Sequence, residues 1–395
     1  MKKGLLLSVV ASGILFAGGD IAPVQPVVPA AAPASCDFWG SLGARYEFIK
    51  DSASADSWGK KDNTWKTALV LGVEKKLGYG FGFGAELGAY SHLGLTDIAT
   101  NTANRAEISQ LYLTYKTGNT AFKAGRQALP KTLSPWAWSD RTVGVLDRAF
   151  NGLVVVNTDL ANTTLVGAWI ASVTDTTSSI KISDNSTNKG LFMVAAEYTG
   201  VANTTIDVSA YYVPKFFSAN KAYSIWASGK TKVNNLDLGL QLAYAKQDGS
   251  KATVGAAGYV GTTFGNIDAK LTVAYIKDGG TTLNLGGTSG FWGNVAYSNF
   301  GGDIINPTDG AKQKIAKLDV GYKLPNNYGK LYAGVAYDDV SDSTVLDKSL
   351  AARLGYSFKV SGINAKIEYR YTKNTPVSGS ARKIQKVRVE GIYKF

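Results

Sequence analysis

The chain has 395 residues, long enough for several soluble domains or for one large barrel. Its net charge is +12, but Lys and Arg are spread thinly, which argues against a nucleic-acid-binding protein and fits a channel lumen or an anionic lipopolysaccharide surface equally well. A single cysteine precludes an intramolecular disulfide, and one cysteine with one histidine excludes the usual His/Cys zinc sites.

The N-terminus has the three parts of a secretory signal peptide. Lys2 and Lys3 precede an apolar stretch over 4–17, and small residues follow it. We therefore predict a signal peptide over 1–22, which leaves a mature charge near +11. Residues 23–36 are rich in Pro and Ala and predict an extended leader, which either threads the periplasm or enters the barrel mouth. Beyond the signal peptide no apolar run reaches about 18 residues, which excludes helical membrane spans.

From residue 37 onward, short segments of alternating apolar and polar residues recur between turn residues. Their length, about 9 to 14 residues, suits a strand that crosses a bilayer. We predict eighteen strands, with sixteen as the alternative because 104–117, 120–129 and 252–264 alternate poorly. The predicted strands are 38–50, 63–76, 80–93, 104–117, 120–129, 149–157, 161–174, 190–200, 204–213, 221–229, 235–247, 252–264, 267–278, 312–324, 329–338, 348–360, 362–373 and 382–395.

The connections sort by length. Short turns such as Gly118-Asn119 and Gly265-Asn266 follow the even-numbered strands, whereas longer loops follow most of the odd-numbered ones. The longer loops are 51–62, 94–103, 130–148, 175–189, 279–311, 339–347 and 374–381. Short periplasmic turns and long extracellular loops are typical of outer-membrane barrels. The sequence thus predicts an all-β transmembrane antiparallel barrel over 37–395, and eighteen strands imply an aqueous pore.

Charged residues fall on one face of several predicted strands, opposite aromatic and aliphatic residues. In 362–373, for example, Glu368 and Arg370 oppose Ile367 and Tyr369. Because successive strand residues point to opposite faces, we expect these charges to line the lumen. The predicted lumen-wall residues are Arg45, Glu47, Arg353, Lys366, Glu368, Arg370 and Arg388, and Lys386 shares their parity.

The loop 130–148 is the third long loop and mixes tryptophans with charges of both signs. We interpret it as an inward-folded constriction with a basic bias, since selectivity in pores arises from charged rings. A solvated surface loop is the alternative. The candidate constriction residues are Arg126, Lys131, Asp140, Arg141, Asp147 and Arg148.

The N-terminal pattern MKKxLLLSVVAS…AGGDIAPVxPVV resembles the major outer-membrane porins of the Campylobacter type. The G-R-Q-x-L at Gly125, the S-D-R at Ser139 and the F-N-G at Phe150 are similar to the third-loop region of those porins and of OprD-like porins, and a final strand ending in Phe is typical of outer-membrane proteins. The resemblance implies an eighteen-stranded barrel, usually trimeric, that passes small hydrophilic solutes. Calcium binds near the constriction in some members, but Asp140 and Asp147 offer too few ligands to predict a metal site.

Two functions therefore stand at this stage. The first is a diffusive porin in the outer membrane of a Gram-negative bacterium, in contact with lipid and lipopolysaccharide and with no cofactor. The second is a surface adhesin that binds a partner through 279–311, where Phe291 and Trp292 are candidate anchors. An enzyme is not expected, because His92, the one histidine, cannot by itself define a catalytic triad.

Overall fold

The computed structural model describes residues 36–53, 63–91, 105–175, 179–181, 190–216, 220–279 and 310–395. The predicted signal peptide and the leader up to residue 35 lie outside these ranges, as do His92 and positions 280–309 of the proposed adhesin loop. Among the described residues, no helix has the length and apolar character needed to cross a bilayer.

The described residues form β-strands almost throughout, with one short 3-10 helix, η2 (Pro325–Asn327), in a turn. The strands are β1 (Cys36–Asp51), β2 (Thr64–Gly78), β3 (Phe81–Ser91), β4 (Arg105–Thr117), β5 (Thr120–Gln127), β6 (Arg141–Thr142), β7 (Val145–Leu146), β8 (Arg148–Asn157), β9 (Thr163–Asp175), β10 (Ser179–Lys181), β11 (Leu191–Tyr198), β12 (Thr204–Phe216), β13 (Asn220–Val233), β14 (Leu236–Gln247), β15 (Thr253–Phe264), β16 (Ile267–Lys277), β17 (Lys312–Lys323), β18 (Lys330–Ser341), β19 (Leu346–Val360), β20 (Ile363–Pro376) and β21 (Arg382–Lys394).

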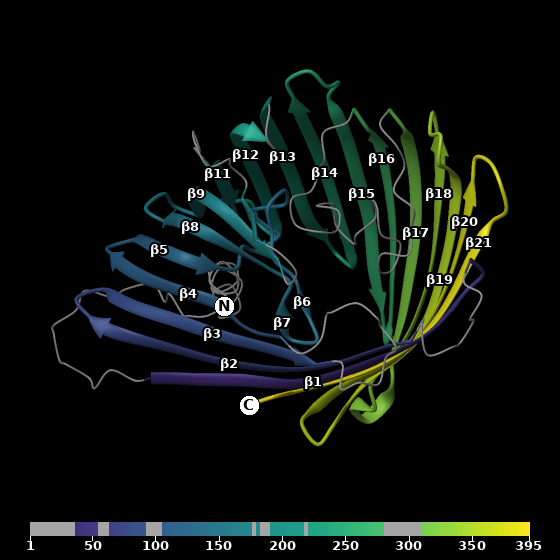
Figure 1. The fold of residues 1–395 in the computed structure, drawn as a ribbon, viewed down its shortest axis with the longest axis horizontal. Helices are drawn as coiled ribbons and strands as arrows, with labels where there is room; N and C mark the ends of the chain where they lie inside the picture. Colours follow the sequence, from purple (N-terminus) through teal and green to yellow (C-terminus); the bar gives the residue numbers. More distant parts are fainter. Residues whose placement is uncertain are drawn as a thin grey trace.

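Eighteen of these strands form one closed antiparallel barrel (Figure 1). Neighbours in the chain pair in order, and β1 closes the ring by pairing with β21 over eleven positions, from Ser41–Lys394 to Asp51–Ile384. The three-residue strand β10 pairs with the last residues of β9, and β11 is the barrel neighbour of β9. We therefore do not count β10 as a separate strand of the barrel. The predicted count of eighteen is confirmed, and the alternative of sixteen is wrong.

The outer face of the barrel is apolar, whereas the inner face has charged and polar residues on many strands and an apolar stretch on β8 to β17. Leu354 is 60% exposed on the outer face and Val194 is 63% exposed, whereas Glu368 on the inner face is only 2% exposed. Strand alternation produces this separation, because residues opposite each other in register share a face. A continuous apolar outer wall is stable only against lipid, so the exposure pattern identifies a membrane-spanning barrel.

The two ends of the barrel differ in the connections that they carry. At one end the strands join through tight turns, and the first turn residues Gly118 and Gly265 have φ near +55°. This positive φ is the backbone conformation of the two-residue hairpin turns whose twist matches that of the flanking strands. The long segment 128–147 lies at the other end. We therefore assign the tight-turn end to the periplasm and the opposite end to the cell exterior.

Several strands extend further than the sequence predicts. β13 continues to Val233 instead of 229, because Lys230 and Lys232 pair with Gly239 and Asp237. The loop predicted at 339–347 shortens to 342–345, since β18 reaches Ser341 and β19 begins at Leu346. In each case backbone pairing with a neighbouring strand continues past the point where the alternation in the sequence becomes weak.

The last strand is fastened to the first at the periplasmic end. The backbone of Phe395 exchanges two hydrogen bonds with Gly40, with N–O distances of 2.8 and 3.0 Å. A Cβ atom at position 40 would lie 2.6 Å from the Phe395 ring, so the ring packs where only glycine leaves room. The terminal aromatic residue thereby covers the seam where the barrel closes.

Candidate functional site: a loop-constricted lumen

The segment 128–147 folds into the barrel instead of covering its outer surface. Leu133 and Trp136 are almost completely buried in a cluster with Phe150, Ile170 and other inner-wall residues of β8 to β17. The Trp136 ring meets the Tyr211 ring edge-on, with centroids 5.4 Å apart. Apolar residues on the inner wall therefore anchor the loop on this side. Figure 1 shows β6 and β7, which belong to the loop, inside the ring of strands.

A second anchor holds the loop to the opposite part of the wall. Val143 and Val145 pack against Ala68 and Val70 of β2. Next to them, the Arg141 guanidinium forms a bidentate ion pair with Glu86 of β3, with N–O distances of 2.5 and 3.1 Å. Glu86 is only 1% exposed, whereas the Arg141 side chain remains 33% exposed, so the pair joins a buried carboxylate to a guanidinium that solvent still reaches. With anchors on both sides, the loop crosses the lumen and narrows it.

The structure brings most of the predicted constriction residues into the lumen. Lys131, Asp140, Arg141 and Asp147 belong to the inward loop, and the Asp147 amide donates to the Asp140 carbonyl at 2.8 Å. Arg148 begins β8 with the same parity as the buried Phe150. Basic and acidic groups thus meet at the narrowed part of the lumen.

Arg126 is the exception, and its assignment to the constriction is corrected. It lies opposite Leu111 in register, and Leu111 is 53% exposed on the outer face. Its guanidinium donates to the Ile108 carbonyl at 2.8 Å and to the Asn151 side chain at 3.3 Å. The sequence placed Arg126 by its closeness to the loop, whereas the strand register decides which face it occupies.

We therefore expect Arg126→Gln to leave the ion preference of the channel unchanged. Its charge is on the far side of the barrel wall from the solute path. In contrast, Arg141→Gln removes the ion pair with Glu86, so this variant should show a larger and less steady conductance. Single-channel recordings of both variants check the prediction, and a changed reversal potential in Arg126→Gln would contradict the outward placement.

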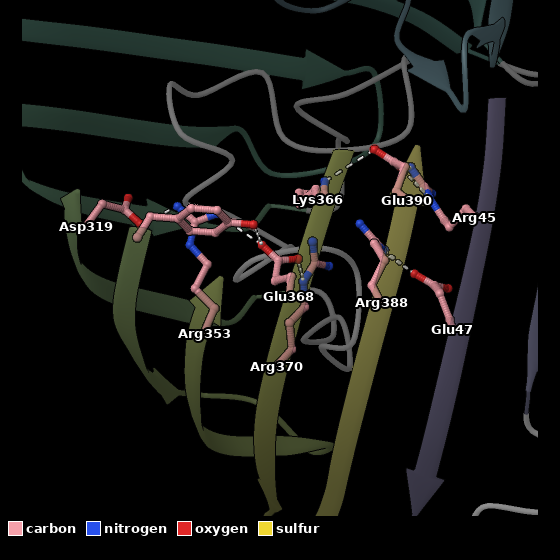
Figure 2. Close-up of polar contacts among 10 residues, drawn as sticks. Arg45, Glu47, Asp319, Arg353, Lys366, Glu368, Arg370, Arg388 and Glu390 are labelled. Atoms are coloured by element: carbon pink, nitrogen blue, oxygen red, sulfur yellow. Dashed lines mark hydrogen bonds and ion pairs between the residues drawn. The ribbon is translucent and has the colours of Figure 1, made fainter. Parts of the chain in front are cut away.

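The predicted lumen-wall residues form neighbouring groups of ion pairs on β1, β19, β20 and β21, which we call together the ion-pair network (Figure 2). Arg45 bonds to Glu390 at 2.5 Å, Arg388 bonds to Glu47, and Arg370 bonds to Glu368 at 2.5 Å. Arg353 extends the network to Asp319 of β17 at 2.6 Å. All seven predicted residues therefore share this part of the inner wall.

Cations outnumber carboxylates in this basic wall, defined as the network residues together with Lys317 and Lys386. It has seven cations and four carboxylates: Arg45, Lys317, Arg353, Lys366, Arg370, Lys386 and Arg388 against Glu47, Asp319, Glu368 and Glu390. The side chains of Arg45, Arg353 and Lys366 remain 16, 25 and 29% exposed. A dissolved anion can therefore reach part of this positive charge.

Three of the cations lie side by side across adjacent strands. Lys386 is opposite Arg370 in register, and Arg370 is opposite Arg353. Like charges in such positions repel each other, and the carboxylate of Glu368 beside them offsets part of the cost. Tyr332 donates a hydrogen bond to Glu368 at 3.0 Å, and its ring crosses Gly355, where a Cβ atom would lie 2.2 Å from the ring. Gly355 thus allows the tyrosine to brace this carboxylate.

Sequence reasoning missed Asp319, Lys317 and Glu86 as parts of the site. Asp319 and Lys317 lie on the inner face of β17 and pair with each other at 3.6 Å. Their alternation with Leu318 and Val320 was a usable signal. Glu86 had no such signal, because its partner Arg141 is 55 residues away and only the folding of the loop joins them.

The two acidic residues of the loop do not by themselves define a metal site. Calcium usually takes six to eight oxygen ligands. Among the described residues, no group of three or more His, Cys, Asp or Glu side chains lies close enough to hold a metal ion. We therefore predict no calcium site here, although some of the porins that the sequence resembles bind calcium near the constriction.

Lys131, which belongs to the inward loop, has an ammonium group that begins to lose its proton near physiological pH. Burial lowers the pKa of its ammonium group from 10.5 to about 8, with Lys317 adding to the effect and Asp140 opposing it. The ammonium lies 4.5 Å from the centroid of the Trp138 ring.

We expect the lumen to lose positive charge at the loop between pH 7 and pH 9, because Lys131 loses its proton in that interval. In the unfolded chain Lys131 keeps its proton up to about pH 10, so between about pH 8 and pH 10 the unfolded state binds more protons than the folded state. The free energy of unfolding therefore rises with pH in that interval. Reversal potentials measured across this range test the idea. Lys131→Arg keeps its charge, and a pH dependence that persists in this variant would assign the effect to another group.

Comparison with known proteins agrees with the barrel geometry. No protein-family model and no curated protein matches the sequence. Among solved structures, Pseudomonas aeruginosa OpdQ is similar with a TM-score of 0.70 and 13% identity, covering 91% of this chain and 97% of that chain. Pseudomonas aeruginosa OpdK with vanillate has a TM-score of 0.67 and 14% identity, with 91% and 99% covered. OccK8 (OprE) of the same species has a TM-score of 0.67 and 13% identity, covering 91% of this chain and 98% of that chain.

The fold defines this protein as a closed eighteen-stranded transmembrane β-barrel with an internal loop. More particularly, the fold is that of Pseudomonas aeruginosa OpdQ, OccK8 and OpdK, the last of which is an outer membrane protein. The expected relation to OprD-like porins is supported at the level of fold, whereas the relation to Campylobacter-type porins remains a prediction from the sequence motifs.

Proposed function

We propose that this protein is an outer-membrane porin through which ions and small hydrophilic solutes diffuse. The observation that carries the proposal is a polar, charged lumen crossed by an anchored loop inside an apolar outer wall. A channel needs an aqueous path with hydrophilic walls, and an eighteen-stranded barrel is wide enough to provide one. Nothing in this arrangement requires an enzymatic activity.

We further propose that the channel prefers small anions, carboxylates in particular. The excess of cations on the basic wall supports this preference, since arginine binds carboxylates in a bidentate geometry. One structure with the same fold, that of OpdK, was obtained with vanillate. Vanillate is therefore a suitable probe of the chemical class for this chain.

The first experiment is a planar-bilayer recording of the refolded protein under a salt gradient. Stable ohmic steps with a reversal potential of the anion-selective sign are expected. The absence of conductance from barrels that still show heat-modifiable migration would contradict the porin proposal and favour the adhesin alternative.

A swelling assay with liposomes then tests the substrate class. Vanillate should enter faster than its neutral analogue vanillyl alcohol, which has nearly the same size. Equal rates for the two compounds would support a general porin and contradict a carboxylate preference. The expected homotrimer rests on the sequence resemblance alone, and light scattering of the detergent-solubilised protein measures it directly.

A further inference from the structure

Three lysines gather on the outer face of the barrel near its closing seam. Lys373 of β20 is directly opposite Lys383 of β21 in register, and Lys50 of β1 is opposite Gln385, two residues further along β21. We call these three residues the outer lysine patch. Their outward direction follows from strand parity, because Phe48, Tyr369 and Val389 on the same faces are 40, 40 and 44% exposed.

The charges of the outer lysine patch have no counter-ion among the described residues. None of the three forms an ion pair with a carboxylate there, whereas the inner arginines Arg370, Arg382 and Arg388 of the same strands do. Two like charges directly opposite each other across neighbouring strands are destabilising. The patch would therefore gain stability from an external anion.

The patch lies at the level where lipid headgroups are expected. Lys373 precedes the end of β20 by three residues, and Lys50 and Lys383 each lie one residue from a strand end, all at the extracellular end. Towards the membrane interior the same face has Tyr369, whose hydroxyl lies 3.4 Å from the Gln385 side-chain oxygen. Tyrosine rings favour the membrane interface, and lysines extend from it towards water.

The periplasmic ends of these three strands lack such charge on the outer face. The outward positions there include Leu42, Ile363, Ala365 and Tyr393. On the outer faces of β1, β20 and β21 the positive charge is thus restricted to the level of the outer leaflet. This asymmetry distinguishes the patch from a general surplus of basic residues in the chain.

We propose that the outer lysine patch binds the phosphate groups of a phosphorylated glycolipid in the outer leaflet. A phosphate offers several strong acceptors and a double negative charge to ammonium groups held close together. The acyl chains would then cover the apolar wall below, including Leu350 and Val387. This inference rests on the proposed outer-membrane location, but not on any particular solute selectivity.

The test compares lipid binding by two variants with equal loss of charge. The patch variant is Lys50→Gln with Lys373→Gln and Lys383→Gln. The control is Lys246→Gln with Lys277→Gln and Lys314→Gln, which are outward lysines of other strands by the same parity. All six side chains are on the outer face, so neither variant disturbs the lumen or the buried clusters.

Native mass spectrometry of the refolded full-length protein measures retained diphosphoryl lipid A, with phosphatidylglycerol as the competing source of phosphate. We expect at least a tenfold weaker retention of lipid A by the patch variant, since each lysine near a charged membrane surface contributes substantially. The control variant should bind like the unmodified protein.

Three outcomes would overturn the proposal: equal retention by the patch variant, equal weakening in the control, or phosphatidylglycerol binding as tightly as lipid A. Single-channel conductance is recorded on the same preparations. Intact conductance with unchanged lipid binding would refute only the lipid site, whereas absent conductance with normal lipid binding would refute only the porin function.

Discussion

Changing Arg353 and Lys386 together to glutamate is expected to reverse the ion preference of the pore from anions to cations. Both residues are in the basic wall, where seven cations face four carboxylates. After the double substitution six carboxylates face five cations. The pair of Arg370 and Glu368, whose side chains are 9 and 2% exposed, is left intact, because removing one partner of a buried ion pair costs about 3–5 kcal/mol. Arg353→Glu does break the pair with Asp319, but those side chains are 25 and 26% exposed, so the cost to folding is smaller.

The double glutamine variant should show an intermediate result, with the anion preference reduced but not reversed. Lys373→Gln with Lys383→Gln is the matched control, since it removes two positive charges from the outer face of β20 and β21. Reversal potentials under a salt gradient compare the three variants. If the outer-face control shifts the potential as much as the lumen variant does, the selectivity arises from total charge and not from the basic wall.

The second large effect is expected from Trp136→Ala, which should increase the single-channel conductance and make it fluctuate. Trp136 is fully buried and packs against Tyr211. Truncating a buried tryptophan typically costs about 3–5 kcal/mol, and here this loss weakens mainly the attachment of the loop to the inner wall. The barrel strands keep their pairing, so far-UV circular dichroism should remain unchanged.

Trp169→Ala is a control of the same chemical kind. Trp169 is on the outer face of β9 with 43% exposure, away from the loop. We expect the normal conductance from this variant. Unchanged conductance in Trp136→Ala would contradict this prediction. It would show that the second anchor, made of the Arg141–Glu86 ion pair and the packing of Val143 and Val145, is enough to hold the loop in the lumen.

The outer lysine patch and the basic wall illustrate how strand parity separates two chemical environments on the same strands. Lys373 and Arg370 are three residues apart on β20, yet one faces lipid and the other faces the lumen. A one-residue change of register would exchange their environments and place arginines in lipid. The ion pairs across β1, β20 and β21 therefore depend on the same register that seals the barrel.

Local alternation was enough to predict the class of fold, a count of eighteen strands with sixteen as the alternative, and the face of most wall residues. Alternation has a period of two, so the direction of Arg45, Glu368 or Arg388 follows from local sequence alone once strand positions are known. The contrast between tight turns and long loops also identified the two ends of the barrel.

Which charges meet, and how the loop crosses the lumen, became visible in the folded barrel and not in the sequence. The pairs of Arg141 with Glu86 and of Arg353 with Asp319 join residues that are 55 and 34 positions apart. The inward position of the loop depends on apolar surfaces from many strands that assemble only when the barrel closes. Arg126 was misplaced for the same reason, because closeness in sequence to the loop does not specify the face of the wall on which a side chain lies.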